Sequence, residues 1–127
     1  MEKLSEEEIH EGNLLIATFM KAQSIHTYEN LNSQLLDFRA ASVWPDNMRY
    51  HSSKILKYHS SYQWIMPVIE TLVPLTTYKS YKIMQHSLYV PGVFVGKGKE
   101  LWVQDDNSVL LFWRFAIQFI RYLNEKN

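Results

Sequence analysis

Residues 109–123 read VLLFWRFAIQFIRYL, the longest apolar-rich run of the chain. Its polar residues, Arg114, Gln118 and Arg121, fall in one narrow sector of a helix, and large apolar side chains cover the remaining surface. Burying one such side chain contributes about 1.5 to 3 kcal/mol, so neither flank of this helix can be left in water. We therefore expect a helix from Val109 almost to the chain end. It is either central in its domain or covered on one flank by a second copy of the chain.

Serine residues mark the expected helix starts. Ser108 follows the turn Asp105–Asn107 and is the expected N-cap of the last helix. Ser5 and Glu8 form a capping box, which predicts a first helix from Ser5 to about residue 22, with Gly12 marking a close contact with a neighbour.

The capping-box spacing recurs at Ser60 and Gln63 and predicts a second helix from about Ser61 to Leu72. Apolar residues at helical spacing support this assignment. Pro67 lies inside the segment, where its missing N–H and bulky ring favour a kink or a short first turn.

Other stretches have the pattern of strands. We expect strands at Arg49–Tyr58 and Tyr78–Tyr89 and a hairpin over Val93–Val103, whose loop is Gly96–Lys99. Residues 24–45 fit a short helix or a strand equally well. The chain is therefore expected to be one domain, residues 1–127, of the α+β class: an antiparallel sheet of three to four strands packed with three helices, in the manner of an αβα sandwich.

Composition excludes several classes of function. Thirteen basic and thirteen acidic residues cancel, which disfavours general binding to nucleic acid. The chain has no cysteine, so disulfides and thiolate chemistry are excluded and a cytoplasmic location is expected. We expect no secretory signal, no membrane span and no cofactor.

The stretch RYHSSKILKYHSSYQW, residues 49–64, contains the tetrapeptide Tyr-His-Ser-Ser twice. A hydrolase would need one of these serines beside an imidazole, and His51, His59 and Ser60 are the residues to watch. Sequence neighbours rarely converge, because successive side chains of a strand point to opposite faces. The favoured interpretation is structural: Ser60 caps a helix, and Tyr50 and Tyr58 share one strand face.

A metal site would have to combine His51 and His59 with His10, His26 or His86. No two histidines have the spacing of a known ligand pair, and zinc requires three or four converging donors. No metal is therefore expected. The run Gly92–Lys97 also lacks the spacing and the following helix of a phosphate-binding loop.

Rings and cations alternate along the strand-rich part of the chain, which makes it the best candidate for a binding surface. Such a surface resembles the stacking platforms of proteins that bind single-stranded nucleic acid. The candidate binding residues are Tyr78, Tyr81, Lys82, Tyr89, Lys97, Lys99 and Trp102.

The segments IATFM (residues 16–20), KYHSSYQWIMPVIETL (57–72) and LLFWRFAIQFIRYLN (110–124), in this order around a hairpin, resemble a group of small phage and prophage-type proteins of Bacteroidetes. These proteins are similar in turn to phage domains described as an alpha-beta-alpha sandwich. The resemblance implies a fold and a mobile-element origin; it implies no activity and no catalytic residue.

The sequence therefore predicts a small protein of phage or prophage origin that acts as a non-enzymatic protein-interaction module, with a protein partner or self-association. The alternatives are single-stranded nucleic-acid binding through the Tyr/Lys strands and, less favoured, a His/Ser hydrolase or metal enzyme.

Overall fold

The computed structural model describes residues 4–41, 43–76, 78–94 and 100–126. Its helices are α1 (Glu6–Phe19), α2 (Tyr62–Leu72) and α3 (Ser108–Lys126), and short 3-10 helices occur at η1 (Glu29–Leu31), η2 (Ser53–Ile55) and η3 (Val73–Leu75). Its strands are β1 (Gln23–Tyr28), β2 (Ser33–Asp37), β3 (Tyr50–Ser52), β4 (Lys82–Met84), β5 (Ser87–Phe94) and β6 (Glu100–Gln104).

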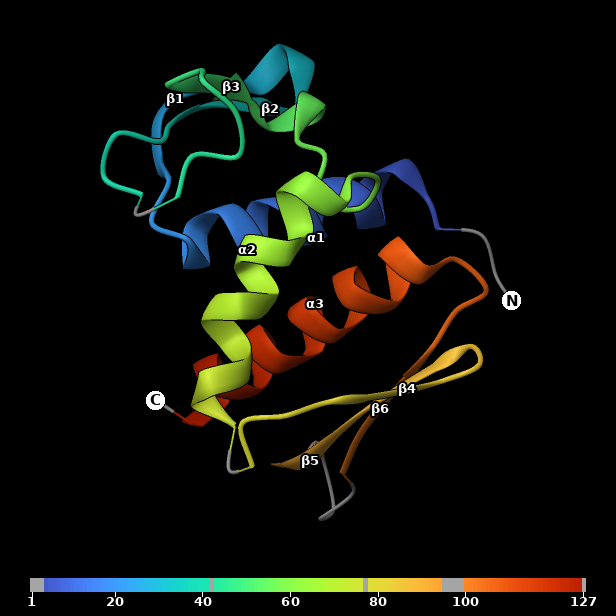
Figure 1. The fold of residues 1–127 in the computed structure, drawn as a ribbon. Helices are drawn as coiled ribbons and strands as arrows, with labels where there is room; N and C mark the ends of the chain where they lie inside the picture. Colours follow the sequence, from blue (N-terminus) through green and yellow to red (C-terminus); the bar gives the residue numbers. More distant parts are fainter. Residues whose placement is uncertain (1–3, 42, 77, 95–99, 127) are drawn as a thin grey trace.

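The strands form two antiparallel sheets, β1-β2-β3 (sheet A) and β4-β5-β6 (sheet B). The three helices lie between the two sheets (Figure 1). The predicted α+β class with three helices and a three-stranded antiparallel sheet is confirmed. The undecided segment 24–45 supplies the hairpin β1-β2 of a further sheet, which the sequence pattern did not reveal.

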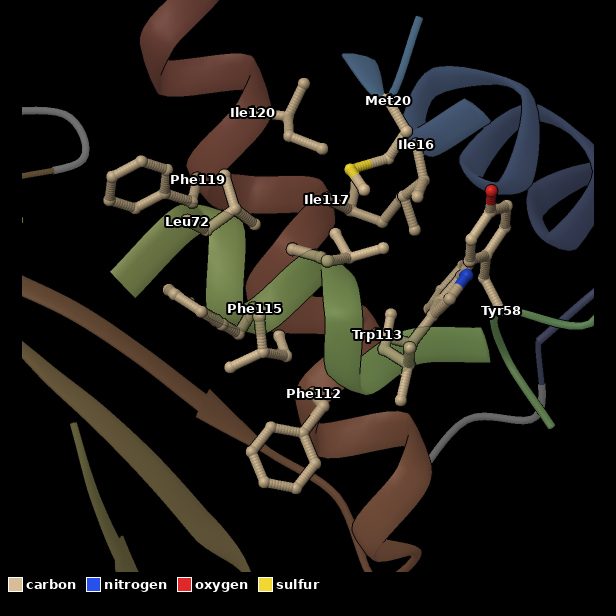
Figure 2. Packing of buried hydrophobic residues seen from close by; sticks show 14 of the residues in the cluster. Ile16, Met20, Tyr58, Leu72, Phe112, Trp113, Phe115, Ile117, Phe119 and Ile120 are labelled. Atoms are coloured by element: carbon tan, nitrogen blue, oxygen red, sulfur yellow. The ribbon is translucent and has the colours of Figure 1, made fainter. Parts of the chain in front are cut away.

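Helix α3 is central, as the first of the two alternatives for this helix required. It contacts α1 and α2 on one side and β5 and β6 on the other. Phe115 and Phe119 are fully buried, and Figure 2 shows them among side chains from α2. Because this burial is complete within one chain, the helix gives no argument for a second copy, and self-association stays a prediction.

The close contact expected at Gly12 is confirmed. A Cβ atom at this position would lie 2.3 Å from Trp113 Cζ2 and 2.9 Å from Ile117 Cδ1. Real atoms never approach so closely, so any side chain here would push α1 away from α3. Gly12 therefore sets the distance between the two helices.

Two of the predicted helix caps are wrong. Helix α2 begins at Tyr62 with Ser61 as its N-cap, without a side-chain hydrogen bond, whereas Ser60 lies in the preceding turn. Gln63, the expected partner of Ser60, instead donates from Nε2 to the Pro45 carbonyl. A long-range partner thus replaced the local one.

The N-cap of α3 is Asn107 rather than Ser108. Its Oδ1 accepts from the backbone N–H groups of Val109 and Leu110, and Ser108 is already helical. At the first helix the Ser5–Glu8 capping box is confirmed, although α1 ends at Phe19 and Lys21 has a positive φ of 73°.

The expected strand Arg49–Tyr58 is also too long. Strand β3 ends at Ser52, whose side chain accepts from Lys54 N and starts η2. Tyr50 is therefore 43% exposed while Tyr58 is 1% exposed, so the two rings do not share a face. The expected strand Tyr78–Tyr89 is divided by a turn at residues 85–86 into β4 and the start of β5, and the loop Gly96–Lys99 lies outside the described residues.

Substitution Gly12→Ala should destabilise the fold by about 1 to 3 kcal/mol, the usual cost of overpacking. At an open helical position the same change is stabilising by about 1 kcal/mol. A loss of stability would therefore indicate that the added methyl group meets Trp113 and Ile117. Urea unfolding measures it, with Thr18→Ala on the exposed face of α1 as the control. A Gly12→Ala protein at least as stable as the parent would contradict the close packing.

Candidate functional site

The first tetrapeptide copy places His51 in the core rather than in a site. Its ring is buried edge-on between Phe38 and Trp64, with centroids 5.2 Å away in both cases. Its Nε2 lies 3.0 Å from Asp46 Oδ1, and its Nδ1 has no hydrogen-bond partner among the described residues. His51 therefore holds sheet A to α2 and anchors Asp46.

The second copy supplies His59, which belongs to a polar cluster around Asn13. The amide of Asn13 is buried; its Nδ2 donates to the Leu56 carbonyl at 3.1 Å, and its Oδ1 accepts from Trp113 Nε1 at 2.9 Å. A carbonyl only accepts and an indole N–H only donates, so these two bonds fix the orientation of the amide. The second Nδ2 hydrogen must then go to His59 Nδ1, 3.0 Å away.

This geometry keeps the His59 imidazole neutral. Nδ1 accepts a hydrogen bond, so the ring proton resides on Nε2, and a proton added to Nδ1 would face the donor of Asn13. Burial acts in the same direction and lowers the pKa of His59.

A serine–histidine pair does exist, between residues that the sequence did not connect. Ser53 Oγ accepts from the backbone N–H of Gln34 at 2.8 Å and lies 2.8 Å from His10 Nε2. Ser53 is only 1% exposed, and no other acceptor for its hydrogen occurs among the described residues, so it donates to His10. The two bonds join α1 to β2 through Ser53, which lies 43 positions from His10 and 19 from Gln34, so no local pattern reveals them.

The residues that a hydrolase or metal enzyme would use do not converge. Ser60 is exposed, and no hydrogen bond joins it to His51 or His59 in the part of the chain that the structure describes. Ser53, which does contact an imidazole, is 1% exposed, and its Oγ is engaged by the Gln34 N–H and by His10. The described ranges also contain no group of three or more His, Asp or Glu side chains placed to hold a metal ion.

Three of the candidate binding residues form one row on the outer face of sheet B. Lys82 pairs with Tyr89 across β4-β5, and Tyr89 pairs with Trp102 across β5-β6. The Tyr89 and Trp102 rings lie 4.5 Å apart at 31°, and Trp102 is 49% exposed. The Tyr89 hydroxyl donates to Glu100, and this bond raises the pKa of Tyr89. Side chains alternate between the two faces along β5 and β6, so the neighbouring residues Leu88, Val90, Leu101 and Val103 face the core.

The other candidates on this surface differ. Tyr78 is exposed, whereas Tyr81 packs edge-on against Phe112 and is half-buried. Lys97 and Lys99 lie outside the described residues.

A further surface was missed by the sequence reasoning: the segment Val43–Arg49, called here the Trp44 loop. It exposes Val43, Trp44 and Met48, with Trp44 40% exposed. The turn at 44–47 was predicted, but an exposed tryptophan on it carries no sequence signal beyond the residue itself.

Side chains from three elements hold the Trp44 loop. Asp37 of β2 accepts two bonds from the Arg49 guanidinium at 3.1 Å, which lower its pKa. Asp46 Oδ1 accepts from the backbone N–H of Met48 at 2.9 Å and lies beside His51 of β3. Gln63 of α2 donates to the Pro45 carbonyl at 3.2 Å.

No protein-family model matches the chain, and no curated protein or solved structure matches it. Phage or prophage origin therefore stays a prediction. Among the described residues no helix combines the length and apolarity that crossing a membrane requires.

The Asn13 cluster makes stability depend on pH. Because the folded pKa of His59 is lowered, unfolding takes up a proton below the ordinary histidine value near 6.5, and stability should fall as pH drops from 7.5 to 5.5. His10, whose pKa is lowered by burial and by Lys54, adds to the same trend. The lowered pKa of Asp37 also stabilises the fold, but this stabilisation is lost only at lower pH, near or below about 4. Asp37 therefore does not affect stability between pH 7.5 and 5.5.

Substitution His59→Gln keeps an acceptor for Asn13 but removes the titration, so its loss of unfolding free energy over this pH range should be smaller than that of the parent. Urea unfolding at each pH measures the difference, with the exposed His26→Gln as control. An unchanged pH slope in His59→Gln would show that the imidazole is not held neutral.

Proposed function

We propose that the protein is a non-enzymatic protein-interaction module that binds its partner through the Trp44 loop. The observation that carries this proposal is an exposed tryptophan, flanked by exposed Val43 and Met48, on a loop held by side chains of β2, β3 and α2. A cytoplasmic location and a mobile-element origin belong to the proposal and rest on the cysteine-free composition and the sequence resemblance.

Tryptophan is the residue type most suited to anchor an interface, because few others remove as much apolar surface from water. An exposed apolar side chain alone is weak support, since folded proteins expose many of them. Val43, Trp44 and Met48 are three exposed large apolar side chains on one short loop, and such a concentration of exposed apolar residues favours an interaction site.

The fixed backbone of the loop strengthens the proposal. Ordering a flexible loop on binding costs free energy that subtracts from affinity. Here the Arg49–Asp37 pair anchors the end of the loop, and the Pro45 and Asp46 contacts anchor its middle. The loop thus presents Trp44 with most of that ordering already done.

Single-stranded nucleic-acid binding is the second candidate, favoured by the Lys82–Tyr89–Trp102 row. The net charge of zero hides a local imbalance, because residues 78–100 contain four lysines and one glutamate. Exposed aromatic rings beside cations are the chemistry of sequence-independent single-strand binding. The absence of an overall basic charge places this candidate second.

Substitution Trp44→Ala should weaken partner binding at least ~30-fold, since truncating a central tryptophan costs about 2 kcal/mol or more. The partner recovered from host extract by the parent protein is purified, and titration calorimetry compares the parent, Trp44→Ala and Trp102→Ala. Binding should be lost only in Trp44→Ala, with the fold unchanged by circular dichroism. A partner that binds Trp44→Ala as tightly as the parent would refute this role of the loop.

The second candidate predicts that a fluorescein-labelled dT oligonucleotide of about 12 residues binds in low salt and dissociates as salt rises. Trp102→Ala should weaken this binding by roughly 5- to 100-fold, equivalent to about 1 to 3 kcal/mol for one stacked base. Fluorescence anisotropy measures it, and Tyr28→Ala, an exposed aromatic change on sheet A, is the matched control. No anisotropy change at low salt would remove this candidate.

A further inference from the structure

A cavity of about 330 Å³ lies beside α1 and η2, and no residue of either proposed binding surface lines it. Its polar lining includes His10 and Glu6 of α1, Lys54 of η2 and His59. This volume is at the lower end of the range for small-ligand sites.

The hydrogen bonds described above determine what the two imidazoles offer to this cavity. His10 Nε2 accepts from Ser53, and His59 Nδ1 accepts from Asn13, so each ring keeps one free N–H, at Nδ1 of His10 and Nε2 of His59. Neither N–H has an acceptor among the described residues, and Lys54 has no ion pair there. The cavity is therefore lined by three donors of which one is charged.

A second cavity of about 310 Å³ adjoins the first, because Ile9 and His59 line both. The remainder of its lining is largely apolar and includes Leu4, Val109 and Leu110. Ile9 and His59 thus lie between a polar cavity and a largely apolar one.

We propose that the two cavities together bind a small organic acid with an apolar tail. Its carboxylate accepts from His10, His59 and Lys54, and its tail lies along Ile9, Leu4 and Val109. A carboxylate suits the site better than phosphate, because a single lysine balances a single negative charge and Glu6 would repel a second one. Glu6 is itself exposed, so water screens its effect on a monoanion. This inference is independent of the partner proposed for the Trp44 loop.

Octanoate is the probe, with acetate lacking the tail and 1-octanol lacking the charge. Two-dimensional NMR should show saturable octanoate binding that shifts the imidazole signals of His10 and His59 and leaves those of the exposed His26 and His86 in place. Acetate and 1-octanol should each bind at least roughly tenfold more weakly. No saturation by octanoate up to about 10 mM, or equal binding of octanoate and 1-octanol, would overturn the proposal.

Substitution Lys54→Met removes the charge and keeps the length of the side chain, and should weaken octanoate binding roughly tenfold. Both Lys54 and its control Lys57 are exposed, so neither change threatens the fold, and Lys57→Met should bind as the parent does. Equal weakening by both variants would indicate general electrostatic attraction and would overturn the assigned site.

Discussion

A helix that is apolar on nearly every side has to be covered from more than one direction, and this requirement arranges the rest of the chain. Helices α1 and α2 cover one side of α3, and strands β5 and β6 cover the other. Both helices precede sheet B in the sequence and α3 follows it, so the last element of the chain lies between two groups formed by earlier segments. Among the described residues sheet A has no contact of comparable extent with α3; His51 of β3 packs against Trp64 of α2, and η2, which follows β3, contacts α1.

Hydrophobic burial alone would allow α1 and α3 to slide against each other, and two polar or steric features prevent this. Gly12 allows Trp113 to approach the α1 backbone, and Asn13 beside it binds the indole N–H of the same tryptophan. The remaining bonds of Asn13 fix the segment between η2 and α2. One buried amide therefore joins three parts of the chain, and removing it would leave several buried polar groups without partners.

The sequence predicted best where the interactions are local or where an apolar pattern is long. The Ser5 capping box, the extent of α2 and the central position of α3 needed no knowledge of distant residues. It failed where a distant group replaced the local partner, as Pro45 did for Gln63. The pair Ser53–His10 and the bonds of the Trp44 loop depend on contacts between separate elements and have no local signature. The row on sheet B could be predicted from the sequence, because strand alternation places Tyr89 and Trp102 on one face once the hairpin is recognised.

The doubled tetrapeptide shows why identical letters do not imply a shared role. In the first copy the histidine enters the core and the last serine is buried against α1, because the segment begins as a strand of sheet A. In the second copy the tyrosine is buried instead, and the histidine reaches Asn13 from a turn before α2. Among the described residues, six large aromatic side chains are exposed: Tyr28, Trp44, Tyr50, Tyr62, Tyr78 and Trp102. The core does not need these rings; under the two proposed functions, Trp44 would bind a protein partner and Trp102 a nucleic acid rather than stabilise the fold.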